Sequence, residues 1–365
     1  MKMMEELKPC AGRYDELTGF FLRYFLKTHP GENIFFSPLS VLMLLSMAAD
    51  ATAGETRRQI TDLLGGPEVK DAGALLGAFQ SMLGAGGEFS SANAVCIRKD
   101  VLPAARKDCL SLLERRYGAE VFRTEDAVKK INNWVRRKTR GMIDGAVDES
   151  AADELMFMLN AVAFEGTWAD PYEDEDIAPG RFYNAGGSAS LVSMLNGGGG
   201  RYIEDGCFTG FVKDYEKREY EFMALLPKEK GQEALGRALE GIRFRELYEG
   251  SVRTGLRTAM PEYSFDFSAE LIPACRELGI RDVFTSEADF SPLSAAPLKA
   301  DSLRHAARIE VDRRGTRAAA LTMMFCGGCP PPDDIKEVVL DRPFVFAVTH
   351  RLSGLPVFAG TVNRL

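Results

Sequence analysis

The sequence predicts a single α+β protein, with helices in the first third of the chain and strands after it. Apolar side chains recur at three- and four-residue spacing in the first third of the 365 residues, which is the period of amphipathic helices. The period changes at the apolar run 156–164, and from residue 180 onward there are many short β-type segments with turns between them. Because no repeat, low-complexity stretch or Pro/Gly linker interrupts the chain, we expect one domain over residues 1–365.

Composition and charge argue against several classes of protein. The net charge of −8 supplies no basic stripe for phosphate contacts, so we expect no nucleic-acid partner. No stretch approaches the ~20 uninterrupted apolar residues of a spanning helix, so we expect no membrane association. Seven cysteines, spread thinly through a long chain, do not resemble a disulfide framework. The first residues, Met1–Lys8, contain no apolar signal core, and no Asn-x-Ser/Thr glycan acceptor occurs.

Four helices are predicted in the first 140 residues. Residues 13–28 form an amphipathic helix that His29-Pro30-Gly31 ends, and residues 39–50 are apolar nearly all round, which predicts a buried helix. Further helices are expected at about 56–64 and 126–140. The apolar face of the first helix consists of Leu17, Phe20, Phe21, Tyr24 and Phe25.

Strands are predicted from residue 156 onward. The apolar run Met156–Phe164 is typical of a strand that is covered on both faces. The glycines of Gly197–Gly200 predict a flexible turn, because no Gly-Lys-Ser/Thr follows to make a phosphate loop. Shorter strands are expected at 201–203, 220–226, 308–311 and 344–348.

The common catalytic patterns are missing from the sequence, so we expect no catalytic residue, no cofactor and no metal site. Cys326-Gly-Gly-Cys329 is one Cys-x-x-Cys pair, whereas a structural zinc site needs two further ligands. Three prolines follow that pair and oppose the helix of a thioredoxin-like redox site. His305 is better interpreted as a hydrogen-bonded core histidine than as part of a catalytic triad.

The segment after Gly315 has two competing interpretations. Ala318–Leu321 favour a helix, and this window alone favours a surface helix or loop. At period two, however, mostly small residues share one face, and such a strand fits between two others over a packed core. That face consists of Thr316, Ala318, Ala320, Thr322 and Met324.

Four motifs resemble the serpin family in order and spacing, from about residue 12 to the end. The resemblance implies an α+β fold with three β-sheets, about nine helices and an exposed reactive loop, here at about 313–341. It also implies a metastable protein that traps proteases by inserting its cleaved loop into the largest sheet. The motifs are Asn33-Ile-Phe-Phe-Ser-Pro-Leu-Ser40, Asn160-Ala-Val-Ala-Phe-Glu-Gly-Thr-Trp168, Ile309-Glu-Val-Asp-Arg-Arg-Gly-Thr316, and Arg342-Pro-Phe-Val-Phe346 with Gly360.

The resemblance also assigns roles to residues. Trp168 matches the tryptophan of the breach, where insertion begins at the top of the sheet, and this role is compatible with core packing. A polar cluster called the shutter holds the middle of the sheet closed and can be remade when the sheet opens. The shutter residues are Ser37, Ser40, Asn160 and His305. The loop hinge comprises Arg313, Arg314, Gly315, Thr316, Arg317, Ala318, Ala319 and Ala320.

The charge of the hinge departs from the family pattern, which is usually acidic here. Arg313, Arg314 and Arg317 stand where acidic residues are common. The family pairs the first acidic position with a lysine just after a Met-Pro dipeptide, but Met260-Pro261 is followed here by Glu262. We therefore predict a charge-swapped pair between Arg313 and Glu262, which also belongs to the breach.

The reactive bond is predicted at Cys329-Pro330, about fourteen residues beyond Gly315. Proline after the cut is a poor substrate for most serine proteases, because its ring replaces an N–H and restricts the preceding residue. Cutting after Phe325, Cys326 or Gly328 is the alternative, although each shortens the inserted strand. A Cys326–Cys329 bridge would make inhibition sensitive to redox conditions.

The resemblance implies an inhibitor that is not an enzyme. The expected partner is a serine protease, elastase-like with a small apolar specificity pocket, held as a covalent acyl-enzyme. We expect a monomer with loop–sheet polymerisation as a side reaction. The alternatives are an inhibitor of papain-like cysteine proteases and a non-inhibitory serpin, which the small face of residues 316–322 disfavours. The family implies a secreted or cell-surface location, with the cytoplasm as the alternative.

Overall fold

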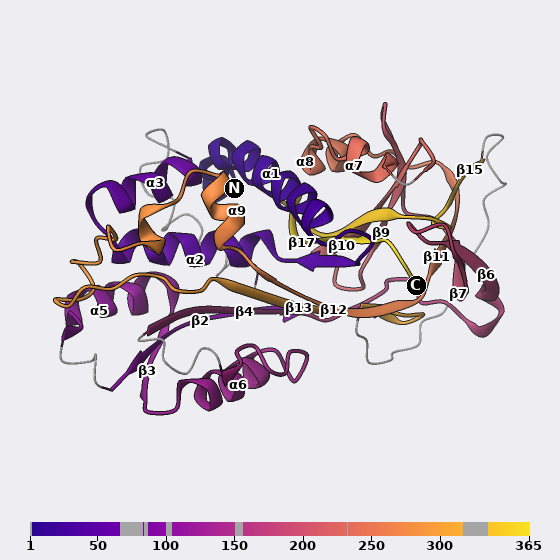
Figure 1. The fold of residues 1–365 in the computed structure, drawn as a ribbon. Coiled ribbons are helices and arrows are strands. Elements are labelled where there is room, and N and C mark those ends of the chain that lie inside the picture. Colours follow the sequence, from indigo (N-terminus) through magenta and orange to yellow (C-terminus); the bar gives the residue numbers. More distant parts are fainter. Residues whose placement is uncertain are drawn as a thin grey trace. The chain divides into compact units, whose positions relative to one another are not determined.

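The computed structural model describes residues 2–65, 83, 87–99, 104–149, 156–231, 233–316 and 335–365, and Figure 1 traces their elements along the chain. The chain divides into two compact units, each assembled from three separate segments. The first unit contains residues 1–13, 39–163 and 268–307, and the second contains residues 14–38, 164–267 and 308–365. The single domain expected over residues 1–365 stays a prediction.

The predicted helices are present, with α1 longer than expected. The helices are α1 (Lys2–Thr28), α2 (Pro38–Ala51), α3 (Gly54–Leu64), α5 (Lys107–Tyr117), α6 (Ala127–Lys138), α7 (Ala234–Ala238), α8 (Phe244–Glu249) and α9 (Ile272–Glu277). Leu17, Phe21 and Phe25 of α1 are buried, because residues four apart lie on one helix face. None of the described helices has a stretch long and apolar enough to cross a membrane.

The first unit contains a three-stranded sheet in the order β3 (Glu120–Thr124), β2 (Phe89–Arg98), β4 (Met156–Phe164). Helix α6 packs against this sheet, as Figure 1 also shows, and its first turn is capped by the Asp126 carboxylate, which accepts from the Lys129 N–H at 3.0 Å. Ile131, Trp134 and Val135 form its buried face. The sequence predicted the bounds of β4 without error.

The second unit contains a six-stranded antiparallel sheet in the order β1-β17-β16-β10-β9-β8. Its strands are β1 (Ile34–Phe36), β8 (Arg201–Glu204), β9 (Phe208–Asp214), β10 (Tyr220–Pro227), β16 (Phe344–His350) and β17 (Leu355–Val362). Gly360 pairs with both Phe35 and Phe346, and a Cβ there would lie 2.3 Å from the Ile34 carbonyl oxygen. The sheet thus brings the first and last serpin-like motifs together at Gly360, a position where any larger side chain would clash with the neighbouring strand.

A second sheet of this unit has the order β15-β11-β7-β6. Its strands are β6 (Ile177–Tyr183), β7 (Ala189–Gly198), β11 (Gly255–Pro261) and β15 (Ile335–Val339), and β15 is parallel to β11. Here the predicted flexible turn Gly197–Gly200 is too long. Gly197 and Gly198 lie in β7 and pair with β11, so only Gly199 and Gly200, both with positive φ, make the turn. Tertiary pairing overrides the weak strand propensity of glycine.

The last sheet has the order β12 (Tyr263–Glu270), β13 (Arg304–Val311), β14 (Gly315–Thr316), β5 (Gly166–Thr167). Only Glu165 separates β5 from β4, so the continuous segment 156–167 contributes to this sheet and to the three-stranded one. The described residues therefore form four hydrogen-bonded sheets, two of which share one stretch of chain.

Candidate functional site

Gly315 and Thr316 of the predicted hinge lie between two strands in the second unit. After β13 the chain reverses, and the two residues of β14 pair antiparallel on both sides. Thr316 is opposite Val311 of β13 and also opposite Gly166 of β5, while Gly315 is opposite Thr167. The hinge therefore begins a strand in the interior of a sheet.

Two glycines make this close approach sterically feasible. A Cβ on Gly315 would lie 2.1 Å from the Gly166 carbonyl oxygen, and a Cβ on Gly166 would lie 2.7 Å from the rings of Phe164 and Tyr215. Thr316 is buried, and its hydroxyl lies 2.6 Å from the Tyr215 hydroxyl. Two of the serpin-like motifs thus meet at their glycines.

Asp312 makes the turn that leads into β14. Its carboxylate accepts from the N–H groups of Arg314 at 2.7 Å and Gly315 at 3.1 Å, and its own N–H donates to the Gly315 carbonyl at 3.0 Å. An aspartate that bonds to backbone groups two and three residues ahead stabilises a tight turn. The turn directs the chain back alongside β13.

The segment that follows β5 clamps this turn from the other side. The Trp168 N–H donates to the Arg314 carbonyl at 2.9 Å, and its indole N–H donates to the Asp312 carbonyl, also at 2.9 Å. The Tyr172 N–H donates to the Arg313 carbonyl at 2.9 Å. Trp168 is buried and stacks on Tyr215 with 4.7 Å between ring centroids, so its indole is fixed in place.

Lys213 of β9 braces the clamp, and sequence reasoning missed it. Its Nζ donates to the Asp170 carbonyl at 2.9 Å and lies 4.5 Å from the centre of the Tyr172 ring and 5.6 Å from that of Trp168. Burial lowers the pKa of Lys213 to about 8. The only signal in the sequence is a lysine directly after the apolar pair Phe211-Val212.

The prediction that the side chains of Arg313 and Glu262 form an ion pair is wrong, because Arg313 has another partner. The guanidinium of Arg313 pairs instead with the exposed carboxylate of Asp174. Glu262 Oε1 accepts from the backbone N–H of Arg313 at 3.2 Å, so Glu262 does contact the hinge. Asp174 also raises the pKa of Arg313, chiefly through this hydrogen bond. A backbone contact satisfies Glu262 and leaves the long arginine side chain free to reach the more exposed partner.

The four predicted shutter residues are buried or half-buried, and they do not all lie in one unit. Ser37 belongs to the second unit, where its hydroxyl donates to the Val357 carbonyl at 2.8 Å. Ser40, Asn160 and His305 belong to the first unit, and Asn160 donates to Asn93 Oδ1 at 2.7 Å and to Ser91 Oγ at 3.2 Å. Burial lowers the pKa of His305 to about 4. The shutter role of these residues stays a prediction.

The last part of the predicted loop, residues 335–341, is described and contains β15, whereas residues 317–334 lie outside the described residues. Residues 317–334 include the hinge residues Arg317, Ala318, Ala319 and Ala320 and the reactive-bond candidates Phe325, Cys326, Gly328, Cys329 and Pro330. The chain is described again from Ile335, at the start of β15. Within the described ranges, no group of three or more His, Cys, Asp or Glu side chains is placed to hold a metal ion.

The site can accept a strand. Both residues of β14 contact the backbone on either side of them. The N–H groups of Trp168 and Tyr172 donate to backbone carbonyls of the turn that precedes β14. Extension of β14 beyond Thr316 would add further backbone pairs between the same neighbours. This geometry therefore favours a conformational change, the lengthening of β14, over a catalysed reaction.

Comparison with known proteins gives one consistent result. A family model described as "Serpin (serine protease inhibitor)" matches residues 15–365. Iripin-2 of Ixodes ricinus is 28% identical over 93% of this chain and 90% of its own length, and leukocyte elastase inhibitor A of Rattus norvegicus is 28% identical over 92% of this chain and 94% of its own. Among solved structures, the thermophilic serpin tengpin in its native state has a TM-score of 0.88 at 29% identity, covering 98% of this chain and 94% of that one.

Proposed function

The chain belongs to the serpin family, and from that premise we propose that it is a suicide-substrate inhibitor of serine proteases that acts by strand insertion. The observation that carries the proposal is β14. Its pairing with β13 and β5 supports the proposal, because an inserted strand would continue from these two residues. The small residues that follow at alternate positions, from Ala318 to Thr322, suit the remainder of the strand.

The mechanism is a competition between two rates. The hydroxyl of the protease attacks the carbonyl carbon of the reactive bond, the amine leaves, and an ester-linked acyl-enzyme forms. The freed loop then extends β14 as residues 316–329 enter the sheet, and each new backbone hydrogen bond stabilises the product by about 0.5–1.5 kcal/mol. Ten to twenty such bonds supply on the order of 10–20 kcal/mol, enough to displace the protease before water hydrolyses the ester. This chain contributes the bond that is cut and no catalytic group.

The proposed target is an elastase-like protease that cuts after Cys329. A small side chain at this position suits a small apolar specificity pocket. The similarity to leukocyte elastase inhibitor A supports this choice of protease to test first. Inhibition of a papain-like cysteine protease is the second candidate, because thiol proteases also form acyl-enzymes.

Incubation with elastase or papain, followed by denaturing electrophoresis, tests the proposal. A protease-dependent band that survives SDS is expected, and mass spectrometry of the C-terminal peptide identifies the bond that was cut. Cleavage of the loop without such a band would show a substrate and not an inhibitor. A complex with papain alone would move the target to the cysteine proteases.

A further inference from the structure

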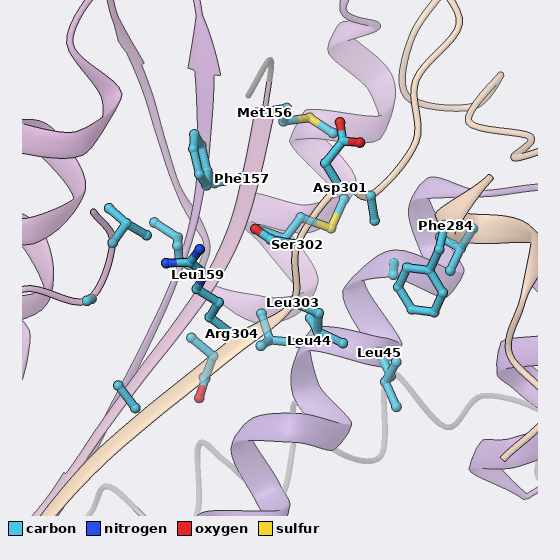
Figure 2. A pocket seen from close by; sticks show the side chains of 18 of the residues that line it. Leu44, Leu45, Met156, Phe157, Leu159, Phe284, Asp301, Ser302, Leu303 and Arg304 are labelled. Carbon is cyan, nitrogen blue, oxygen red and sulfur yellow. The ribbon is translucent and has the colours of Figure 1, made fainter. Parts of the chain in front are cut away.

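A cavity of about 130 Å³ lies beside the edge of β4 in the first unit. Figure 2 shows its walls: Leu44 and Leu45 come from α2, Met156 and Phe157 from β4, and Leu303 from the segment that enters β13. Among the described residues, β4 is the end strand of its three-stranded sheet. The cavity therefore adjoins a strand edge.

The cavity reaches both faces of β4. Phe157 and Leu159 face α6, where they pack with the cluster around Trp134. Met156 and Met158 alternate with them, so they point to the opposite face. All four line the cavity, which must therefore pass the edge of β4 in the plane of the sheet. This is the position that a neighbouring strand would take.

The charged groups at the cavity are already paired. Lys299 bonds to Asp301 at 2.6 Å, and Arg304 bonds to Asp148 at 2.8 Å. Most of the remaining lining is apolar, as the labelled leucines and phenylalanines in Figure 2 illustrate. A ligand for this cavity should therefore carry no charge, because a charge would lose its hydration without gaining a free counter-charge.

One polar residue of the lining, Asn160, has a side-chain acceptor without a hydrogen-bond partner among the described residues. Asn160 Oδ1 is buried and accepts no hydrogen bond from the part of the chain that the structure describes. Its orientation is fixed by a relay: Asn93 Nδ2 donates to the Tyr117 carbonyl at 2.8 Å, so Asn93 Oδ1 must face Asn160 Nδ2, at 2.7 Å. The amide of Asn160 cannot flip without breaking this relay.

We propose that this cavity binds a small uncharged aromatic molecule with one hydroxyl donor, of the phenol class. An apolar cavity of about 150 Å³ is sufficient for a benzene ring, and this one is of similar size. The ring fills the apolar part, and the hydroxyl donates to Asn160 Oδ1. The donor matters because a buried acceptor without a partner loses its hydration.

The ligand would also regulate the insertion of the loop, an extension that rests on the proposed function. A ring beside the edge of β4 takes the position that an inserted strand requires. The bound protein should therefore insert its cleaved loop more slowly, and more of the protease should escape. Binding itself can be measured on the intact chain without any protease, so the two claims can fail separately.

The test compares 4-fluorophenol with 4-fluorotoluene, which has nearly the same shape and no donor, by ¹⁹F NMR titration of the intact protein. The phenol is expected to bind between about two- and tenfold more tightly, the range for one hydrogen bond. Equal affinities, or no binding of either probe, would overturn the assignment. This comparison needs no variant, so it holds even if a substituted protein does not fold.

Two matched variants locate the site. Ala300 is half-buried and lines the cavity, whereas Ala295 is exposed and lies outside the lining. Ala300→Leu should weaken both probes by at least about tenfold, because the larger side chain fills the cavity, and Ala295→Leu should change neither. An unchanged affinity in Ala300→Leu would refute this location. If the phenol binds as expected but leaves the yield of SDS-stable complex unaltered, the link to insertion is refuted.

Discussion

The two ends of the segment 156–167 differ in what lies beside them. At Gly166 and Thr167, the neighbouring position holds β14, which is joined to them by backbone pairs. Thr316 of β14 also contacts the hydroxyl of Tyr215. At Met156–Ala161, the neighbouring space is a mainly apolar cavity with one unpartnered acceptor. One end of this segment is therefore already paired with a strand from the hinge, whereas the other end borders the cavity for which we propose a small uncharged ligand.

Gly315→Ala should have the largest effect, since it prevents β14 from pairing at the Gly166 end of the segment. The new Cβ would meet the Gly166 carbonyl oxygen at 2.1 Å, so β14 could not pair with β5 as it does now. We expect the yield of SDS-stable complex to fall by about five- to 150-fold, because each 1.4 kcal/mol is a factor of ten and overpacking costs about 1–3 kcal/mol. Gly206→Ala is the control, because nothing lies within 4 Å of a Cβ there. Full inhibition by Gly315→Ala would mean that β14 is not required.

His305 tests the other end, since its neighbours Arg304 and Ala306 line the cavity. Burial lowers its pKa to about 4, so the unfolded chain takes up a proton at a higher pH than the folded one. Stability should therefore be full above pH 6.5 and fall by roughly 3 kcal/mol as the pH drops to about 4.

Melting temperatures at pH 7 and pH 5 check this prediction, together with NMR titration of the imidazole ring. His350 is also buried, with its pKa lowered to about 4, so the two contributions must be separated. His305→Gln should remove only part of the pH dependence, and His350→Gln should remove another part. A ring of His305 that titrates near 6.5 would contradict the prediction.

Trp168→Phe sharpens the contrast by loosening the clamp without blocking β14. It removes the indole N–H that bonds to the Asp312 carbonyl and reduces the stacking on Tyr215. A loss of roughly 2 kcal/mol in stability is expected from a buried large-to-small change with a lost hydrogen bond. Thermal unfolding measures it. Trp134→Phe is a matched control, since Trp134 is similarly buried but packs against the three-stranded sheet. An equal fall in the yield of SDS-stable complex in both variants would rule out a specific role for Trp168.

Glu262→Lys should have the smallest effect on stability, but it should increase the fraction of protein in inactive or polymerised conformations. It replaces the acceptor of the Arg313 N–H with a second positive charge beside the arginine. We expect more inactive and polymerised protein on storage, seen by native electrophoresis and size-exclusion chromatography. Glu262→Gln keeps an acceptor oxygen and should behave like the parent protein. No change in Glu262→Lys would show that this contact does not tether the hinge.

The sequence was most informative where one local pattern decides a structure. The apolar run of β4 and the amphipathic pattern of α6 gave elements within a residue or two of their observed bounds. Gly197 and Gly198 were misjudged because only pairing with β11, some sixty residues away, makes them a strand. The motifs assigned Gly315 to the hinge and Trp168 to the breach, but the partner of Arg313 and the brace by Lys213 were missed. These contacts join residues far apart in the sequence, so a local pattern such as a lysine after an apolar pair does not identify the partner.

Cleavage of the chain before residue 335 should leave its C-terminal part bound. β15 pairs in parallel with β11, and β16 and β17 lie in the interior of the six-stranded sheet. Both of the latter strands are buried and flanked by neighbours on each side, so hydrolysis before residue 335 divides the polypeptide without detaching its last part. The nicked protein should migrate as one particle under native conditions. Its short C-terminal fragment would separate only in detergent or denaturant.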